Sequence, residues 1–224
     1  KRVTELNYAY QDTRYMAAKG FRKALYPDTH SFHYSSYGSV DTLPQITSTD
    51  LHNFHESYYQ PDSIIIVVVG AVNPHQAIEV LEKQLGDWEN SHTVITPTMP
   101  QLTTPKEAVL VETRLAGKIQ ADIVMGLVGP SRFSEDYLAA QIANSILGEF
   151  GMMGRVGNII REQLGLAYYA YSRLDGGEGQ GAWTIAAGVA PENVTLAIEK
   201  ARDEIALLTR ELVSLDDLED NQSY

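Results

Sequence analysis

Two histidines and a glutamate in one short helical stretch are the side chains most suggestive of metal chemistry. His52, His55 and Glu56 are all residue types that bind zinc. The inverted zinc motif H-x-x-E-H, however, places its histidines four positions apart, with the glutamate directly before the second one. Here the histidines are three positions apart and Glu56 follows His55. We therefore expect an ordinary helix surface at this cluster and no metal ligand in the chain.

Other catalytic motifs are missing from the sequence. It contains no cysteine, which excludes disulfides, thiolate zinc sites and a cysteine nucleophile. Neither G-x-S-x-G nor a phosphate-binding glycine loop occurs, and the glycine cluster over residues 176–181 is typical of a hairpin turn. His30 and His33 lie in a stretch rich in Ser, Tyr and Gly, where we expect them to pack a loop.

The charge balance bears on the possible partners. Against 29 acidic residues there are only 17 Lys and Arg, giving a formal net charge of -12. Such a surface repels phosphate backbones and anionic membranes, so nucleic acid is not an expected partner. The longest apolar run, residues 64–69, is far too short to span a bilayer. We expect a soluble protein and leave its compartment, cytoplasmic or periplasmic, open.

The first ninety residues show signals for helices and one strand. Thr47 with Asp50 at N3 predicts a helix start, and Asn73 followed by Pro74 predicts another. Apolar stripes indicate the buried sides of these two helices: Leu51, Phe54 and Tyr58 in the first, Ile78, Leu81 and Leu85 in the second. In chain order we expect a helix over residues 1–25, a surface loop over 28–46, a helix from Thr47, a buried strand over 64–70, and a helix from Pro74 that ends at Gly86.

A Thr- and Pro-rich stretch separates these elements from the second half. Residues 91–105 have no apolar period, which predicts a linker between a first unit (1–90) and a second (106–224). In the second unit we expect strands over 108–113 and 119–128, a helix from Ser134 to about residue 147, a shorter helix over 154–164, a hairpin pairing 166–174 with 182–189, and a last helix from Pro191.

The two halves share a pattern of strand, glycine, proline and helix. It occurs over residues 64–70 before Pro74 and again over 182–188 before Pro191. This pattern is consistent with duplication of one α+β unit. The sequence also opens at Lys1 within apparent helix and ends at Tyr224 without an obvious ending, so we expect a fragment.

Two stretches resemble a known family of zinc peptidases. Residues 50–62, DLHNFHESYYQPD, precede an apolar segment ending at Gly70. The second and more specific stretch combines Ile146-Leu-Gly, a Gly-rich break, and residues 160–168, IREQLGLAY. Both are similar to the pitrilysin, insulinase and mitochondrial processing peptidase family. The resemblance extends over nearly the whole chain.

The resemblance implies a fold class. Members of this family are α+β proteins built from ferredoxin-like sandwich units, with antiparallel sheets and helices on one face, two units to each half-molecule. By this resemblance the chain is the C-terminal part of a first unit and most of a second, truncated at its end. Its fold would be the metallohydrolase fold of the processing peptidases.

The resemblance also implies a site. In active members one half-molecule binds zinc through H-x-x-E-H and a later Glu, while the other supplies an Arg and a Tyr seven residues apart. Arg161 and Tyr168 match that pair in type and spacing. Both are hydrogen-bond donors suited to a peptide carbonyl or to the oxyanion formed from it. We expect Arg161 in the last turn of a helix, Gly165 reversing the chain, and Tyr168 on the following strand.

Partners and cofactor follow from the same resemblance. Zinc is expected on a missing domain or partner subunit, and a second half-molecule would complete a homo- or heterodimer. The substrate would be a peptide or an unfolded polypeptide, and this chain alone would be inactive. Two alternatives stay open: an inactive scaffold or peptide-binding subunit of the same fold, and an unrelated α+β binding protein.

Overall fold

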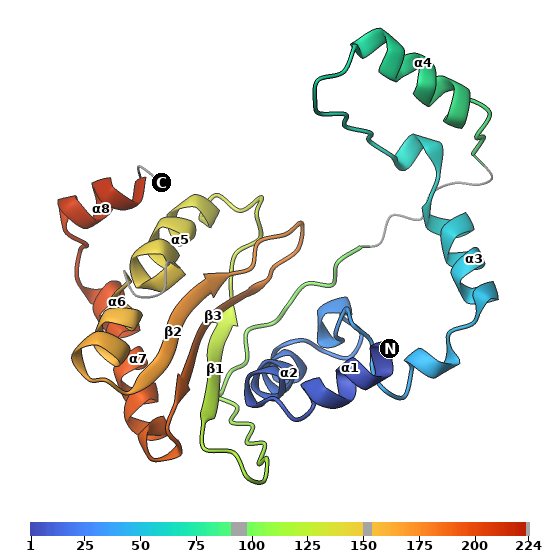
Figure 1. The fold of residues 1–224 in the computed structure, drawn as a ribbon. Coiled ribbons are helices and arrows are strands. Elements are labelled where there is room, and N and C mark those ends of the chain that lie inside the picture. Colours follow the sequence, from blue (N-terminus) through green and yellow to red (C-terminus); the bar gives the residue numbers. More distant parts are fainter. Residues whose placement is uncertain (91–97, 150–153, 223–224) are drawn as a thin grey trace. The chain divides into compact units, whose positions relative to one another are not determined.

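The computed structural model describes residues 1–90, 98–149 and 154–222, which form two compact units (Figure 1). One unit combines residues 1–40 with residues 99–224, and the other comprises residues 41–98. The boundary after residue 98 lies within the predicted linker, of which residues 91–97 fall outside the described part. In this division residues 1–40 belong with the second half of the chain. The predicted units, 1–90 and 106–224, stay a prediction.

The larger unit is built on a three-stranded antiparallel sheet with the order β1-β3-β2. β3 (Ala182–Val189) pairs with both β1 (Ala121–Val128) and β2 (Ala167–Leu174). The predicted hairpin across the glycine cluster is confirmed, as is the predicted strand that became β1. The α+β class with an antiparallel sheet is therefore confirmed.

Helices surround this sheet. Residues 1–25 form two helices where one was expected, because the Asp12 carboxylate accepts a 2.7 Å hydrogen bond from the Tyr15 backbone N–H and caps a new helix start. The helix predicted from Ser134 begins only at Tyr137.

None of the described helices is long and apolar enough to cross a membrane. The helices of this unit are α1 (Arg2–Ala9), α2 (Thr13–Leu25), α5 (Tyr137–Asn144), α6 (Arg155–Gly157), α7 (Val194–Arg210) and α8 (Leu215–Gln222), with π-helical turns η4 (Ser145–Glu149) and η6 (Asn158–Gln163).

The core lies mainly on one face of the sheet. There Ile160 of η6 and Val156 of α6, both fully buried, pack against Val189 of β3 and Ala197 of α7. On the other face α2 lies beside β1, with Leu25 and Tyr26 in contact with Ala182 (Figure 1). The sheet thus carries helices on both faces, and α2 is an addition to the one-sided arrangement that the sequence suggested.

In the smaller unit, the local helix signals are confirmed. The Thr47 hydroxyl accepts from the Asp50 N–H at 3.2 Å, and the Asp50 carboxylate accepts from the Thr47 N–H at 2.8 Å, so a capping box starts α3 (Ser48–Tyr58). The Asn73 side chain accepts from the His75 N–H at 3.0 Å and caps α4 (Pro74–Leu85). Gly86 follows the last residue of α4, as expected, in a right-handed conformation with φ -62.

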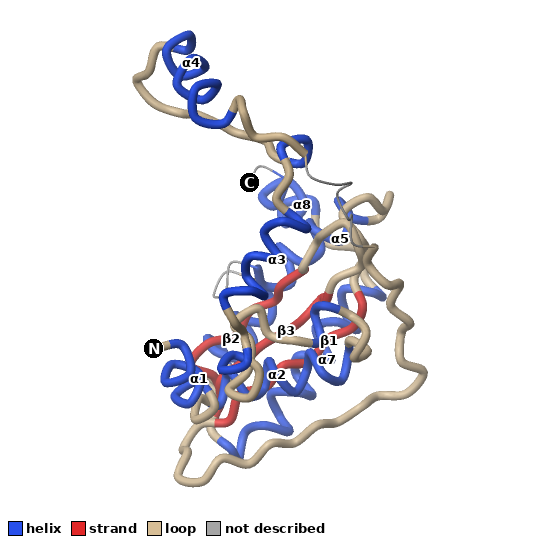
Figure 2. The backbone as a smooth tube through the Cα atoms, turned by 90° about the vertical axis from the view of Figure 1, so that its right-hand side faces the viewer, coloured by secondary structure: helices blue, strands red, loops and turns tan. Residues whose placement is uncertain are grey.

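The predicted buried strand over residues 64–70 is wrong. In the structure this segment pairs with no described residue, Figure 2 shows strands only in the β1-β3-β2 sheet, and Ile65 and Val69 are each 90% exposed. The segment predicted as a strand over 108–113 likewise pairs with no described residue, and Leu110 is 87% exposed. An apolar run favours an extended backbone, but a strand also needs a hydrogen-bonded neighbour.

The buried sides expected of α3 and α4 are wrong for a related reason: within the described part of the smaller unit, no layer covers them. The exposed apolar side chains on these two helices are Leu51, Phe54, Tyr58, Ile78 and Leu85.

Candidate functional site

Arg161 lies in the last turn of η6, as expected. The turn is anchored by Ile160, whose side chain is fully buried in the core beneath the sheet. The Arg161 side chain is 40% exposed and lies 3.7 Å from the Glu162 carboxylate. A cation here also suits the negative end of the helix dipole. The guanidinium is therefore held near the surface by a single loose ion pair.

Gly165 reverses the chain between Arg161 and β2. Its φ of +62 lies in the left-handed region, which L-residues with a Cβ adopt at a cost. The Gly165 N–H donates to the Arg161 carbonyl at 3.0 Å, and the Leu166 N–H donates to the Ile160 carbonyl at 2.9 Å. These bonds close the helical turn, so the chain enters β2 within two residues. The expected role of Gly165 is confirmed.

Tyr168 is the extra residue of a β-bulge. Ala167 pairs with Val189 and Tyr169 pairs with the adjacent Gly188, so Tyr168 has no partner across the ladder. A bulge residue is freed from the alternation that fixes its neighbours and is often found re-aimed at functional sites. The Tyr168 side chain is 66% exposed. Its position at the start of the strand after the turn was expected, whereas the bulge was not.

The next tyrosine along β2 is held firmly. The Tyr169 hydroxyl donates to the Asp122 carboxylate on β1, which also accepts from the Thr13 hydroxyl at 2.5 Å and from the Gln120 amide. The Arg14 guanidinium lies 4.5 Å from the centre of the Tyr169 ring. Burial, together with the bond to Asp122, raises the pKa of Tyr169 well above its usual range. Its phenol therefore stays a protonated donor.

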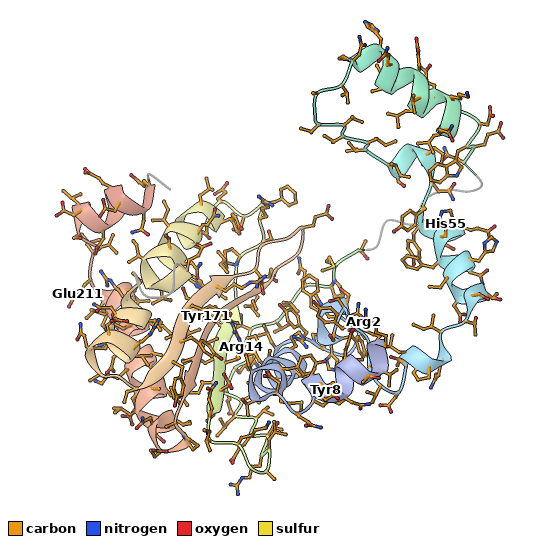
Figure 3. The ribbon with its side chains drawn as sticks, viewed as in Figure 1. Arg2, Tyr8, Arg14, His55, Tyr171 and Glu211 are labelled. Carbon is orange, nitrogen blue, oxygen red and sulfur yellow. The ribbon has the colours of Figure 1, made fainter. Side chains whose placement is uncertain are left out.

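Arg14 links α2 to a second tyrosine of the same strand. Its guanidinium donates to the Tyr171 hydroxyl at 3.0 Å, and both residues are labelled in Figure 3. Sequence reasoning missed this whole group, because Thr13 and Asp122 are 109 positions apart and Tyr169 and Asp122 are 47 apart. The only sequence signal is the Tyr-rich run at the start of β2, which by itself identifies no partner.

The expected pair is not joined directly. Arg161 and Tyr168 lie on either side of the Gly165 turn, but no hydrogen bond or ring contact connects these two described side chains. Their convergence on one substrate atom stays a prediction.

The histidine clusters belong to surface and loop. His52 pairs with Glu56 at 3.2 Å on an exposed side of α3, and His55 stacks on Tyr59. His30 is buried between aromatic rings of its loop, so its expected packing role is confirmed. Over residues 1–90, 98–149 and 154–222, no three His, Asp or Glu side chains are placed to hold a metal ion. The described residues therefore do not fit a zinc site.

Comparison with known proteins identifies the family. Residues 45–223 match the family model described as the peptidase M16 inactive domain. Because this match covers most of the chain, the chain belongs to the M16 peptidase family. The resemblance seen in the sequence is confirmed at this level, and an unrelated α+β binding protein is excluded.

Individual relatives show the same class. Over 200 residues the chain is 28% identical to the uncharacterized zinc protease YmxG of Bacillus subtilis, covering 89% of this chain and 47% of the relative. Over 173 residues it is 27% identical to YmfF of the same organism, named a probable inactive metalloprotease, covering 74% of this chain and 38% of the relative. The crystal structure of a peptidase M16 inactive domain from Pseudomonas fluorescens has a TM-score of 0.86 at 23% identity, over 99% of this chain and 53% of that one. The chain thus spans less than half the length of these curated relatives.

Proposed function

We propose that this chain supplies the substrate-binding half of a zinc-dependent peptidase, with Arg161 and Tyr168 holding the scissile peptide. The observation that carries the proposal is the bulge. The exposed phenol of Tyr168 is the unpaired residue of the bulge. It follows the Gly165 turn, and the exposed guanidinium of Arg161 precedes that turn. Residues of just these types match the family pair.

The chemistry of the two side chains suits the role. A guanidinium is always charged and a phenol donates one hydrogen bond, so both favour an oxygen that gains negative charge. Peptide hydrolysis develops such a charge on the carbonyl oxygen as it is attacked. Donors that strengthen in the transition state raise kcat more than they tighten substrate binding.

The zinc of this peptidase is proposed to lie on another domain or on a partner subunit. Two observations support this placement: the described residues hold no metal-binding cluster, and the chain covers less than half of relatives that are named zinc proteases. The partner is a second half-molecule of the same family, as a homo- or heterodimer or within one longer chain. The substrate is a peptide or an unfolded polypeptide.

A second candidate is an inactive scaffold or peptide-binding subunit of the same fold. It is favoured by the description of the matched family model as an inactive domain and by the name of one relative. This candidate predicts that Arg161 and Tyr168 can be replaced without loss of turnover.

Steady-state kinetics of the complete protein with its zinc-bearing partner or domain distinguish the two candidates. Arg161→Ala should lower kcat by roughly 100- to 1000-fold, the loss typical of an oxyanion donor, with a small change in KM. Arg202→Ala, which removes an exposed arginine of α7, is the matched control and should leave kcat unchanged. Near-normal turnover in Arg161→Ala would favour the scaffold.

A further inference from the structure

The direction of Tyr168 depends on what fixes the residues beside it. As the extra residue of the bulge it makes no ladder pair of its own. Ala167 on one side pairs with Val189 and packs its methyl group against the core, but it makes no polar side-chain contact. Tyr169 on the other side contacts Arg14 through its ring and donates to Asp122 through its hydroxyl. The orientation of the bulge is therefore set chiefly by where the Tyr169 ring is held.

The Tyr169 ring reaches Asp122 by crossing the central strand. Tyr169 and Asp122 are both register partners of Gly188, from opposite sides of β3. A Cβ at Gly188 would lie 2.5 Å from Cε1 of Tyr169 and 2.8 Å from Nε2 of Gln120, far closer than van der Waals contact allows. Glycine at this position leaves the space in which the ring lies.

The acceptor at the end of this path, the Asp122 carboxylate, also accepts from two other residues. Thr13, the first residue of α2, donates to one oxygen of Asp122, and Gln120 lies within 3.2 Å of both oxygens. The carboxylate is consequently satisfied by donors that do not depend on Tyr169. Arg14 of α2 covers the ring from above and places a positive charge near the carboxylate. The position of the Tyr169 ring is therefore fixed in the absence of a substrate.

From this geometry we infer that Tyr169, Asp122 and Gly188 are positioning residues that fix the bulge and so set the direction in which Tyr168 presents its phenol. The consequence for turnover rests on the proposed function of Tyr168, but the consequence for the Tyr168 ring does not. Tyr169→Phe removes only the hydroxyl that donates to Asp122. Gly188→Ala adds a Cβ in the space that the Tyr169 ring occupies. Both should release the bulge.

A spectroscopic measurement tests the inference without activity. 3-Fluorotyrosine incorporated at position 168 of the full-length protein should give one sharp fluorine resonance, and Tyr169→Phe or Gly188→Ala should shift it, broaden it or split it. Tyr8→Phe is the control, because it removes a tyrosine hydroxyl at an exposed position of α1, outside the Thr13–Asp122–Tyr169 contacts. It should leave the resonance unchanged.

Kinetics of the assembled enzyme provide the second measurement. Tyr169→Phe should lower kcat roughly tenfold or more with little change in KM, since a displacement of about 1 Å at a reacting group can cost as much as 100-fold. The double variant Tyr168→Phe/Tyr169→Phe should be no slower than Tyr168→Phe alone, because the second residue acts through the first. Thermal unfolding of each variant separates this effect from loss of folded protein.

Each outcome has one meaning. A fluorine change in Tyr169→Phe that is absent in Tyr8→Phe supports the positioning role. This holds even if Tyr168→Phe retains full activity, a result that would contradict the proposed function instead. A fluorine spectrum in Tyr169→Phe identical to that of the parent protein would overturn the inference. So would a double variant whose loss of kcat is the product of the two single losses.

Discussion

At the scale of single residues, adjacent tyrosines have opposite surroundings. Tyr169 is half-buried, bonded to Asp122 and covered by Arg14, and its pKa is raised by burial. Tyr168 is 66% exposed and unpaired in the ladder. The Tyr169 phenol already bonds within the fold, whereas the Tyr168 phenol is accessible from solvent. Side-chain type alone could not assign these roles, because the bulge that separates them arises from pairing with β3.

His30 provides a residue-scale prediction about pH. Burial lowers its pKa, and its Nδ1 accepts from the Phe32 N–H at 3.1 Å, so the folded state holds the ring neutral. An unfolded histidine titrates near pH 6.5, so below about that pH the unfolded state binds more protons and stability falls. Stability from this group is complete above about pH 6.5.

Denaturant titrations of the full-length protein at a series of pH values test this assignment. The fall in free energy of unfolding between about pH 7 and pH 5 should be smaller in His30→Gln than in the parent protein. Equal slopes in His30→Gln and the parent protein would refute the assignment.

At the scale of elements, the Gly165 turn connects the two proposed site residues. Apart from its own chain neighbours, no described residue lies within 4 Å of where its Cβ would be, so any effect of Gly165→Ala comes from its φ of +62. This variant should lose about 1–2 kcal/mol of stability. Gly20→Ala is the contrasting control: Gly20 lies in the middle of α2 and its Cβ would meet Val111 at an ordinary 3.5 Å.

The two alanine variants should therefore move in opposite directions. Gly20→Ala should gain roughly 0.5–1 kcal/mol, as alanine replaces glycine inside a helix. The measurement is chemical denaturation of both variants. Comparable stability changes of the same sign would show that the turn does not require the left-handed conformation.

Elements also differ in how far sequence could predict them. The capping box at Thr47, the cap at Asn73 and the hairpin over residues 176–181 depend on residues a few positions apart, and the sequence was sufficient for each. The strand expected over residues 64–70 depends on a partner strand, which no local pattern identifies. For the same reason the Thr13–Asp122–Tyr169 contacts, which join distant segments, were invisible in the sequence.

At the scale of the whole molecule, the proposed chemistry is divided between this chain and another domain or subunit. This chain alone should hold no stoichiometric zinc, because its His52, His55 and Glu56 have the wrong order and are exposed on α3. Metal analysis after dialysis should find zinc in the complete protein with its partner and not in this chain alone. One tightly bound zinc per isolated chain, lost in His52→Ala, would refute this division.

The central claim is that Tyr168 acts on the reaction itself. Its most direct test is the single-turnover rate of peptide cleavage by Tyr168→Phe in the complete zinc-loaded enzyme, at saturating enzyme, with Tyr8→Phe of exposed α1 as control. The account predicts a rate roughly 100- to 1000-fold lower in Tyr168→Phe, with parental zinc content and thermal stability, and an unchanged rate in Tyr8→Phe. A parental rate in Tyr168→Phe would contradict it.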